Sequence, residues 1–555
     1  MALQDILHTV PAISPAVLIL SLLILPILIL TLTYAYTTFR YHRRLSSFTR
    51  PSDTAQGPPQ IPYSVPYLGN SVSFLAPYPG QFWTRLFSTY RLRPTGACTL
   101  LLGGQPTHVL FDAGAVHALF KARSPTRDRF NAQVMQNSFG VARADIAKFY
   151  GAVEATGRPE DRVDPRWETS ESQYEYMIRT DRVSELTEEF GTRFREALKE
   201  RAGEDSGEVL LSVWLRERMF KASTDAFLGT RLLEVYPELE KEFWAFDRAM
   251  LPLFFGLPKF IIPEEYKARE KALAGMERWH EAVWEESKGQ PIEPDDVRWE
   301  PIYGSRLNRA RQRFYMYRGI SVRCKAGADL GVVFALSSNA IPASTWMLLH
   351  ILNPKGDKTL LPRVLAELET ARNDDGLNIS TLISLPLLQS IFQEILRLYA
   401  DVLVTRDINA DLVLPLGDGK RKIQFRKGEM VMAPSWLAQR DEQRWINPPH
   451  DVFYAERFIK RDPDTGVDMF TMTGTGGSFF PFGGGKTICP GRVFAKQEVL
   501  AAVATVLLNY DIQPISFIDE QGNERDKFPG LAKRFGGNGV MTMDGDMKMK
   551  MKKRV

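Results

Sequence analysis

The segment from Phe480 to Ala495 constrains the fold of this chain more than any other part of it. It reads Phe-Pro-Phe-Gly-Gly-Gly-Lys-Thr-Ile-Cys-Pro-Gly-Arg-Val-Phe-Ala and places four glycines around Cys489. Glycine lets a backbone turn tightly and lie against a flat group, because no Cβ needs room. Pro490 and Gly491 precede a predicted amphipathic helix, so the Cys489 sulfur lies near a helix N-terminus, where the dipole and free N–H groups favour the thiolate. The pattern predicts a thiolate held against a flat cofactor.

Two other interpretations of this segment are a phosphate-binding loop and a structural cysteine. Gly-Gly-Gly-Lys-Thr resembles the end of a phosphate-binding loop, but that motif requires a glycine where this chain has Phe480. A lone buried cysteine beside a helix is otherwise usually structural.

Composition excludes several classes of protein. The 555 residues include 70 Lys and Arg against 66 Asp and Glu, so the small net charge does not imply a nucleic-acid partner. The three cysteines are Cys98, Cys324 and Cys489, which cannot build a disulfide framework or a four-cysteine zinc site. A reducing, cytosol-facing environment fits best.

The N-terminal region predicts a membrane anchor. Residues 10–36 are almost wholly apolar, which is long enough for a spanning helix of ~20 residues. Basic residues follow this run and none precedes it, so the rest of the chain is expected in the cytosol. A cleaved signal peptide fits poorly, because it would have a basic start and a shorter core; a buried N-terminal helix is the other alternative. We expect an anchor over 1–45, a proline-rich lead-in over 46–80 and a catalytic domain over 81–555.

Apolar periodicity predicts a mainly α body with small β-sheets. Helical spacing is present over Leu210–Leu228, Val322–Leu352 and Leu387–Leu398. Near the end, Val540–Met543 and Met547–Lys552 alternate around an Asp-Gly turn and predict a hairpin with methionines on one face and lysines on the other.

Two arginine–carboxylate motifs stand before the cysteine segment. Glu394 and Arg397 are three residues apart, so they share a helix face and can pair. Further on, Glu456-Arg457-Phe458 follows Ala455. Taken alone, such pairs are usually solvated surface bridges.

Together with the spacing Phe482-x-x-Gly485-x-x-x-Cys489-x-Gly491, these motifs resemble the cytochrome P450 family over nearly everything after Pro58. The resemblance implies the P450 fold in one catalytic domain, with haem b bound through Cys489 as the axial iron ligand. It implies that Phe482 lies beside the sulfur and that Gly485 and Gly491 shape the loop near the ring.

The resemblance also implies roles for charged residues. Glu394, Arg397 and Arg457 would form a structural cluster, and Arg406 would bind a haem propionate, although a surface arginine is the alternative. Many family members have Arg or His at the position of Thr487; here Lys486 is the candidate for the missing charge. The family's Trp-x-x-x-Arg motif is not found, since Trp167 lacks an arginine at that spacing.

The expected distal helix departs from the common pattern. Most such oxygenases carry an acid–alcohol pair that delivers protons, whereas this chain has Asn339-Ala340 with Ser338 before it and Pro342 after it. Proline costs ~3 kcal/mol inside a helix and kinks it, so we expect either a kinked helix presenting Asn339, with Ser338, to the iron-bound ligand, or two helices with a polar join. The Asn-x-x-Pro arrangement and the Thr-Ile-Cys sequence are similar to the branch of sterol 7α-hydroxylase and prostacyclin synthase.

Pocket positions follow from the family register. They are Phe139, Phe334, Ala335, Val404 and Thr405, and the alternative is that these residues belong to the ordinary core.

The resemblance implies a monooxygenase of the endoplasmic reticulum membrane that hydroxylates a lipophilic molecule such as a terpenoid, sterol or other secondary metabolite. No flavin or nicotinamide motif is found, so NADPH–cytochrome P450 reductase is the expected electron donor. The alternatives are an isomerase or dehydratase of a peroxide, which needs no NADPH, and a haem-binding membrane protein without turnover.

Overall fold

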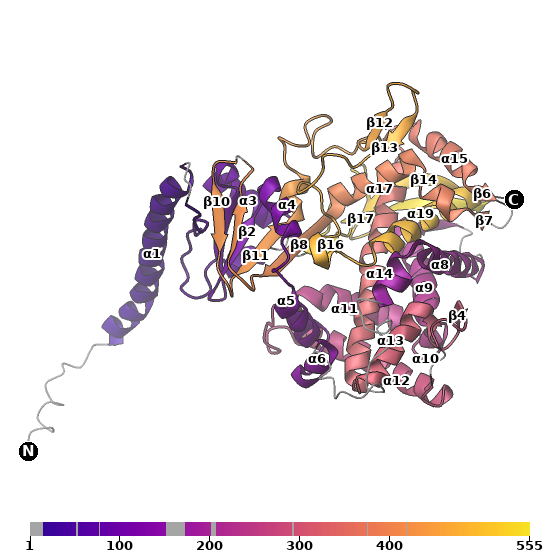
Figure 1. Ribbon diagram of the computed structural model, residues 1–555, viewed down its shortest axis with the longest axis horizontal. Helices are drawn as coiled ribbons and strands as arrows, with labels where there is room; N and C mark the ends of the chain where they lie inside the picture. The colour runs from indigo at the N-terminus through magenta and orange to yellow at the C-terminus, as the bar shows by residue number, and fades with distance from the viewer. Residues whose placement is uncertain are drawn as a thin grey trace, which may run out of the picture.

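The computed structural model describes residues 15–50, 54–76, 78–150, 172–200, 207–290, 293–373, 376–417, 419–534 and 536–554. Most of the described chain is helical, and the strands form small sheets at two sides of the helical body (Figure 1). The α-helices are α1 (Pro15–Phe48), α2 (Ser71–Phe74), α3 (Gln81–Tyr90), α4 (Ala113–Lys121), α5 (Asp128–Gln133), α6 (Arg143–Tyr150), α8 (Thr180–Glu200), α9 (Leu211–Leu228), α10 (Arg231–Val235), α11 (Leu239–Phe254), α12 (Pro263–Glu286), α13 (Arg306–Tyr317), α14 (Val322–Ile351), α15 (Leu360–Thr370), α16 (Ile379–Leu382), α17 (Pro386–Tyr399), α18 (Ser435–Gln439) and α19 (Arg492–Asn509). Shorter 3₁₀ and π turns are η1 (Arg93–Thr95), η2 (Val134–Ser138), η5 (Tyr174–Ile178) and η7 (Gly485–Thr487).

A five-stranded sheet with the order β1-β2-β11-β8-β16 forms one wall of the interior. A second, four-stranded sheet has the order β15-β14-β17-β3, and the remaining strands pair two by two. The strands are β1 (Ala97–Leu102), β2 (Gln105–Leu110), β3 (Glu208–Leu210), β4 (Trp299–Glu300), β5 (Gly304–Ser305), β6 (Arg372–Asn373), β7 (Gly376–Leu377), β8 (Ala400–Asp407), β9 (Leu412–Pro415), β10 (Lys422–Phe425), β11 (Met430–Pro434), β12 (Ile459–Arg461), β13 (Asp468–Phe470), β14 (Tyr510–Asp519), β15 (Glu524–Arg525), β16 (Asn538–Val540) and β17 (Gly545–Lys553).

The three helices predicted from apolar spacing are confirmed as α9, α14 and α17. Pro386 occupies the first turn of α17, where its missing N–H costs nothing. The Glu367 carboxylate of α15 accepts the free N–H groups of Leu387 and Leu388 at 2.9 and 3.0 Å, so a side chain from another helix caps this terminus.

Helix α14 is the central helix of the body, and it continues from Val322 to Ile351 although Pro342 lies inside it. The alternative of two helices with a polar join is therefore wrong. Among the described residues, α14 is the one helix that meets length and hydropathy criteria for a membrane span, and 83% of its apolar window is buried inside the protein. Its hydropathy is that of a core helix.

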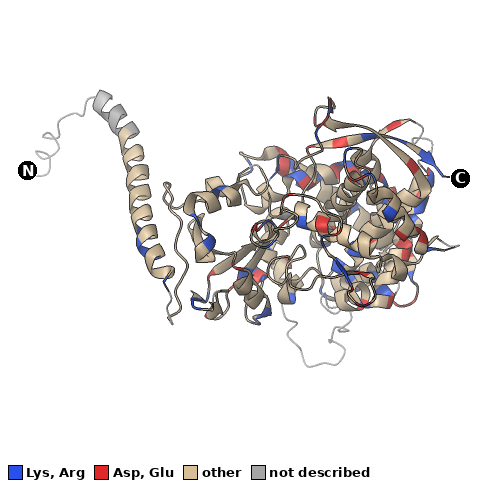
Figure 2. Ribbon diagram, turned by 90° about the horizontal axis from the view of Figure 1, so that it is seen from above, with Lys and Arg blue, Asp and Glu red and all other residues tan. Residues whose placement is uncertain are grey.

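Helix α1 lies beside the body rather than within it (Figure 1). Its apolar side chains are largely exposed, for example Ile27 at 63% and Leu32 at 60%. Figure 2 shows the described part of α1 almost without charge until its C-terminal portion, whereas Lys and Arg mix with Asp and Glu over the body.

The hairpin predicted near the C-terminus is wrong in its pairing. Strand β17 buries Met547, Met549 and Met551 on one face, as the alternation indicates. Its partners, however, are β14 and β3, while β16 pairs with β8. Long-range burial of the methionine face decides the pairing, and the local Asp-Gly turn does not.

Candidate active site

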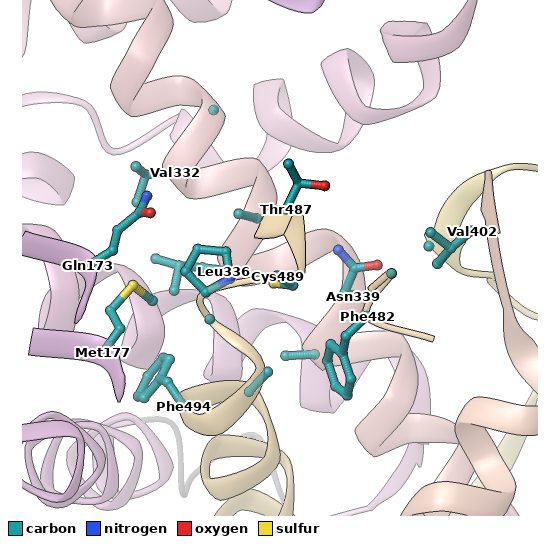
Figure 3. A pocket seen from close by; sticks show the side chains of 18 of the residues that line it. Gln173, Met177, Val332, Leu336, Asn339, Val402, Phe482, Thr487, Cys489 and Phe494 are labelled. Atoms are coloured by element: carbon teal, nitrogen blue, oxygen red, sulfur yellow. The ribbon is translucent and has the colours of Figure 1, made fainter. Parts of the chain in front are cut away.

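A cavity of about 550 Å³ lies between the cysteine segment and helix α14. Figure 3 shows Cys489, Phe482 and Asn339 around this space. The α14 residues of the lining recur every three or four positions and so form one stripe: Ala328, Gly331, Val332, Ala335, Leu336, Asn339, Ala340 and Ala343. Strand β8 adds Val402, Leu403, Val404 and Arg406.

Cys489 is exposed onto this cavity, at the start of the turn that leads into α19. Its own N–H donates to the carbonyl of Phe482 at 2.9 Å, which fixes the loop. Burial raises the pKa of the Cys489 thiol, and hydrogen bonds from the backbone N–H groups of Gly491 and Arg492 lower it only in part. In the chain alone, desolvation therefore opposes the effect of the helix terminus, and a bound metal cation would favour the thiolate.

Gly485 is required by a close approach, and Gly491 lies beside the sulfur. Gly485 has a φ of +65°, and a Cβ there would lie 2.4 Å from the backbone oxygen of Phe120, so this glycine lets the loop pass helix α4. The neighbour of Gly485 is thus α4, and Gly485 is absent from the cavity lining. A Cβ on Gly491 would lie 3.8 Å from the Cys489 sulfur, so Gly491 keeps space beside the sulfur.

The surroundings of Arg406 indicate whether the cavity fits a haem. Its guanidinium is 4% exposed and donates to the backbone oxygens of Thr405 and Gly484 at 2.7 and 2.5 Å. Among the described residues no carboxylate pairs with it, and burial lowers the pKa of Arg406 to about 10. A buried cation without an anion is costly, and a cofactor carboxylate would supply the missing charge. The buried hydroxyl of Thr487 also lacks a partner in the described chain, so the lining fits a flat, acidic cofactor held by a cysteine.

Glu394, Arg397 and Arg457 form one buried cluster behind the cysteine segment. Arg397 Nε lies 2.7 Å and Arg457 Nε lies 3.0 Å from Glu394 Oε2, with side chains 0–5% exposed. Both guanidinium groups also donate to backbone carbonyls of the segment between α18 and β12, including those of His450 and Pro448. The cluster therefore ties α17 to the chain that leads into the cysteine loop.

Asn339 is held in the cavity by strand β16. Its Oδ1 accepts the backbone N–H of Val540 at 3.0 Å, and its Nδ2 donates to Ser338 Oγ at 3.3 Å. A Cβ on Gly539 would lie 1.9 Å from Asn339 Oδ1, so only glycine fits beside the amide. Ser338 Oγ donates to the carbonyl of Phe334 at 2.7 Å.

Of the remaining predicted residues, some line the cavity and others do not. Ala335 and Val404 line the cavity; Phe139, Phe334, Thr405 and Ser338 lie outside its lining. Phe334 and Ser338 are off the α14 stripe, and Thr405 points to the opposite face of β8 from Val404. Phe139 is buried against Phe334 and Phe246 instead.

Lys486 does not face the cavity: it is exposed, and its Nζ donates to the carbonyl of Arg123 at 3.4 Å. It cannot supply the charge missing at Thr487. Trp167 lies outside the described residues.

Several lining residues were missed, among them Arg127, Met177, Phe494 and Glu498. Glu498 accepts a hydrogen bond from Ser223 at 2.5 Å, and burial raises the pKa of Glu498 to about 8. The sequence alone could have indicated Glu498, because it is a lone acidic residue at the start of an apolar helical run. Arg127 and Met177 come from distant segments whose sequence carries no such signal.

Comparison with known proteins agrees with this geometry. The model of the cytochrome P450 family matches residues 330–538. The chain is 31% identical over 447 residues to the cytochrome P450 monooxygenase calL of Penicillium decumbens, covering 78% of this chain and 81% of that one. It is 29% identical over 525 residues to the cytochrome P450 monooxygenase efuG of Hormonema carpetanum, covering 87% and 89%.

The resemblance to a particular branch is also supported at lower coverage. Cytochrome P450 7A1 of Oryctolagus cuniculus is 27% identical over 56% of this chain and 59% of its own length. Prostacyclin synthase of Bos taurus is 31% identical over 36% of this chain and 40% of its own. Because the identity to calL extends over most of both chains, this protein belongs to the cytochrome P450 monooxygenase family.

Proposed function

We propose that this protein hydroxylates a lipophilic small molecule, such as a terpenoid, sterol or other secondary metabolite, with dioxygen and electrons from NADPH–cytochrome P450 reductase. The observation that carries the proposal is the cavity between Cys489 and Asn339, whose lining is mostly apolar apart from a few polar groups. Such a cavity orients an apolar substrate chiefly by shape.

Haem b would be held by Cys489 at the iron and by Arg406 at a propionate, with Phe482 beside the sulfur. Bound there, it supplies the activation of dioxygen, and the cysteine thiolate favours cleavage of the O–O bond. Residues of the chain itself would position the substrate and supply the proton. The α14 stripe and Val404 position the substrate, and the Asn339 amide, fixed by Val540, holds a water from which a proton can be passed.

The exposed apolar side chains of α1 support a single-pass anchor in the endoplasmic reticulum membrane, with the body in the cytosol. Basic residues follow the apolar run at Arg40, Arg43 and Arg44. The lead-in over 46–80 would then set how the body over 81–555 sits at the membrane, where a lipophilic substrate is concentrated.

The test begins with the visible spectrum of the dithionite-reduced protein with carbon monoxide. A strongly red-shifted Soret band in the wild type, absent in Cys489→Ala, is expected. Reconstitution with the reductase, NADPH and labelled dioxygen should then place one labelled oxygen atom in the product of an apolar substrate. Absence of the red-shifted band would overturn the haem-thiolate assignment.

A second candidate is isomerisation of a lipid peroxide. Asn339 in place of an acid–alcohol pair is compatible with it, because an isomerase needs no proton delivered to dioxygen, but this residue does not choose between the two activities. Turnover of a hydroperoxide without NADPH, together with no incorporation of labelled dioxygen, would select this candidate over the hydroxylase.

A further inference from the structure

Trp346, Tyr399 and His350 form a compact aromatic group where helices α14 and α17 meet. The rings of Trp346 and Tyr399 stack face to face, with centroids 3.7 Å apart and planes 5° apart. Most aromatic pairs in proteins are offset or edge-on at 4.5–7 Å, so this overlap is unusually complete. The hydroxyl of Tyr399 lies 2.7 Å from Nε2 of His350.

The group lies about one helical turn beyond the lining of the active-site cavity, along α14 and α17. Trp346 follows the lining residue Ala343 by three positions on α14, and Tyr399 follows Leu396 by three positions on α17. Three residues advance a helix by about 4.5 Å. Strand β16 and its extension join the group to the cavity, since Trp346 Nε1 donates to the carbonyl of Met541 at 2.7 Å, next to Val540.

His350 is placed to accept the proton of Tyr399. Burial lowers the pKa of His350 to about 3, so its ring is neutral and a nitrogen lone pair is available. Burial also raises the pKa of Tyr399, so the phenol keeps its proton at rest. Oxidation of a phenol makes it strongly acidic, and a base already in contact removes the cost of separating the charge.

We propose that Trp346, Tyr399 and His350 are a redox-active relay that gives up an electron to the active-site cavity when oxidising equivalents form there without a substrate to consume them. Trp and Tyr are the most easily oxidised aromatic side chains. The stacked indole delocalises the charge between cavity and phenol, and the bonded imidazole stores the proton. The relay would spare the cofactor and the cavity lining from oxidation during unproductive turnover.

The step balances as follows with a peroxide or peracid as oxidant. Tyr399 loses one electron through Trp346 to the cavity and one proton from Oη to Nε2 of His350, which leaves a neutral phenoxyl radical and an imidazolium. The electron would be one of the two that reduce the O–O bond of the oxidant, and a haem held by Cys489 would supply the other. An external reductant, or the next reductase electron, restores the phenol and returns the proton.

The experiment mixes the haem-loaded ferric protein with meta-chloroperoxybenzoic acid, freezes it within milliseconds and records electron paramagnetic resonance. We expect an organic radical with tyrosyl hyperfine structure that narrows when the protein carries ring-deuterated tyrosine. Tyr399→Phe should abolish the tyrosyl signal, Trp346→Phe should reduce it, and His350→Gln should reduce it because an amide cannot take the proton. In all three variants the haem should bleach faster under peracid.

Tyr303→Phe is the matched control, because Tyr303 is also buried but donates to the carbonyl of Val283 and stacks on no tryptophan in the described chain. A tyrosyl signal that persists unchanged in Tyr399→Phe, or wild type without any organic radical, would overturn the relay. Should Tyr399→Phe fail to fold, the deuterated wild type and peptide mapping of oxidised Trp346 and Tyr399 decide. A normal carbon monoxide spectrum with no radical refutes the relay alone, whereas no red-shifted band refutes the proposed function itself.

Discussion

Two buried carboxylates, Glu394 near the cysteine segment and Asp401 at the β8–β16 sheet edge, differ in their side-chain partners. Behind the cysteine segment, Glu394 accepts from both Arg397 and Arg457, and the spare N–H groups of these arginines reach backbone carbonyls. On the side of α14 and the β8–β16 sheet edge, both carboxylate oxygens of Asp401 are buried without a side-chain partner in the described chain.

This difference separates groups that hold the fold from groups that are available for chemistry. A fully paired cluster is costly to break, because removal of one member leaves buried charge behind. A buried group without partners lowers stability, and such groups persist where something else is gained from them. We therefore expect substitutions on the cysteine side to act mainly on stability, and those on the α14 side to act mainly on turnover or pH dependence.

The largest effect is expected for Glu394→Gln. Loss of the carboxylate leaves Arg397 and Arg457 as adjacent buried cations, which should cost about 3–5 kcal/mol of unfolding free energy. The measurement is chemical denaturation of the purified protein, followed by far-ultraviolet circular dichroism. Glu456→Gln is the control: Glu456 forms an ion pair with Arg363 at the partly exposed surface, so it should cost at most about 1 kcal/mol. Equal effects of the two would contradict the role of the cluster.

Asn339→Leu should act on turnover instead. Removal of the amide that holds a proton-carrying water should lower product formation about 100-fold, the low end of acid–base contributions, while the red-shifted carbon monoxide band and NADPH consumption persist. Ser337→Ala is the control, since the Ser337 hydroxyl lies on the same helix but has no partner in the described chain. Full activity in Asn339→Leu would remove Asn339 from the reaction.

Much of the cysteine side could be predicted from the sequence, because its determinants are local. The spacing of Glu394 and Arg397 within one helix and the Cys489 segment are each contained in a few residues. Helix α14 was predictable for the same reason, through its long apolar run.

The α14 side depends on contacts between distant segments, which a single sequence does not encode visibly. Asn339 is oriented by Val540, 201 residues away, and β17 pairs with β14 and β3 rather than with the strand before it. The predicted role of Lys486 fails because the loop turns its side chain outward, and the prediction for Thr405 fails because adjacent strand residues face opposite sides.

Gly539→Ala tests the orientation of Asn339 without removing the amide. The new Cβ would occupy the position of Asn339 Oδ1, and Gly539 has a φ of +132° that other residues rarely adopt, so the amide should be displaced and product formation should fall about 10-fold, less than for its removal. The strain should also cost about 1–3 kcal/mol of stability. Gly207→Ala has a similar φ of +145° with nothing within 4 Å, and it should leave turnover unchanged. Loss of turnover in both variants would show that backbone strain, not Asn339, is responsible.

Asp401→Asn should act on the pH dependence of stability. Burial, opposed in part by Arg440, raises the pKa of Asp401 to about 6, against about 3.9 in an unfolded chain. The folded state therefore binds the extra proton between about pH 4 and 6, so the stability that this group contributes is present below pH 4 and is lost as the pH rises through 6. At pH 7 the ionised carboxylate costs about 2–3 kcal/mol, and Asp401→Asn should be the more stable protein there.

The difference in thermal unfolding between wild type and Asp401→Asn, recorded from pH 4 to pH 8, isolates this group from the other carboxylates. Its sign decides between two states of the sheet edge. A variant that gains stability as the pH rises marks Asp401 as an unpaired acid, in contrast to Glu394. A variant that loses stability at pH 7 would mean that Asp401 is ionised and paired with Arg440 through water. Asp401 would then be a paired carboxylate, as Glu394 is.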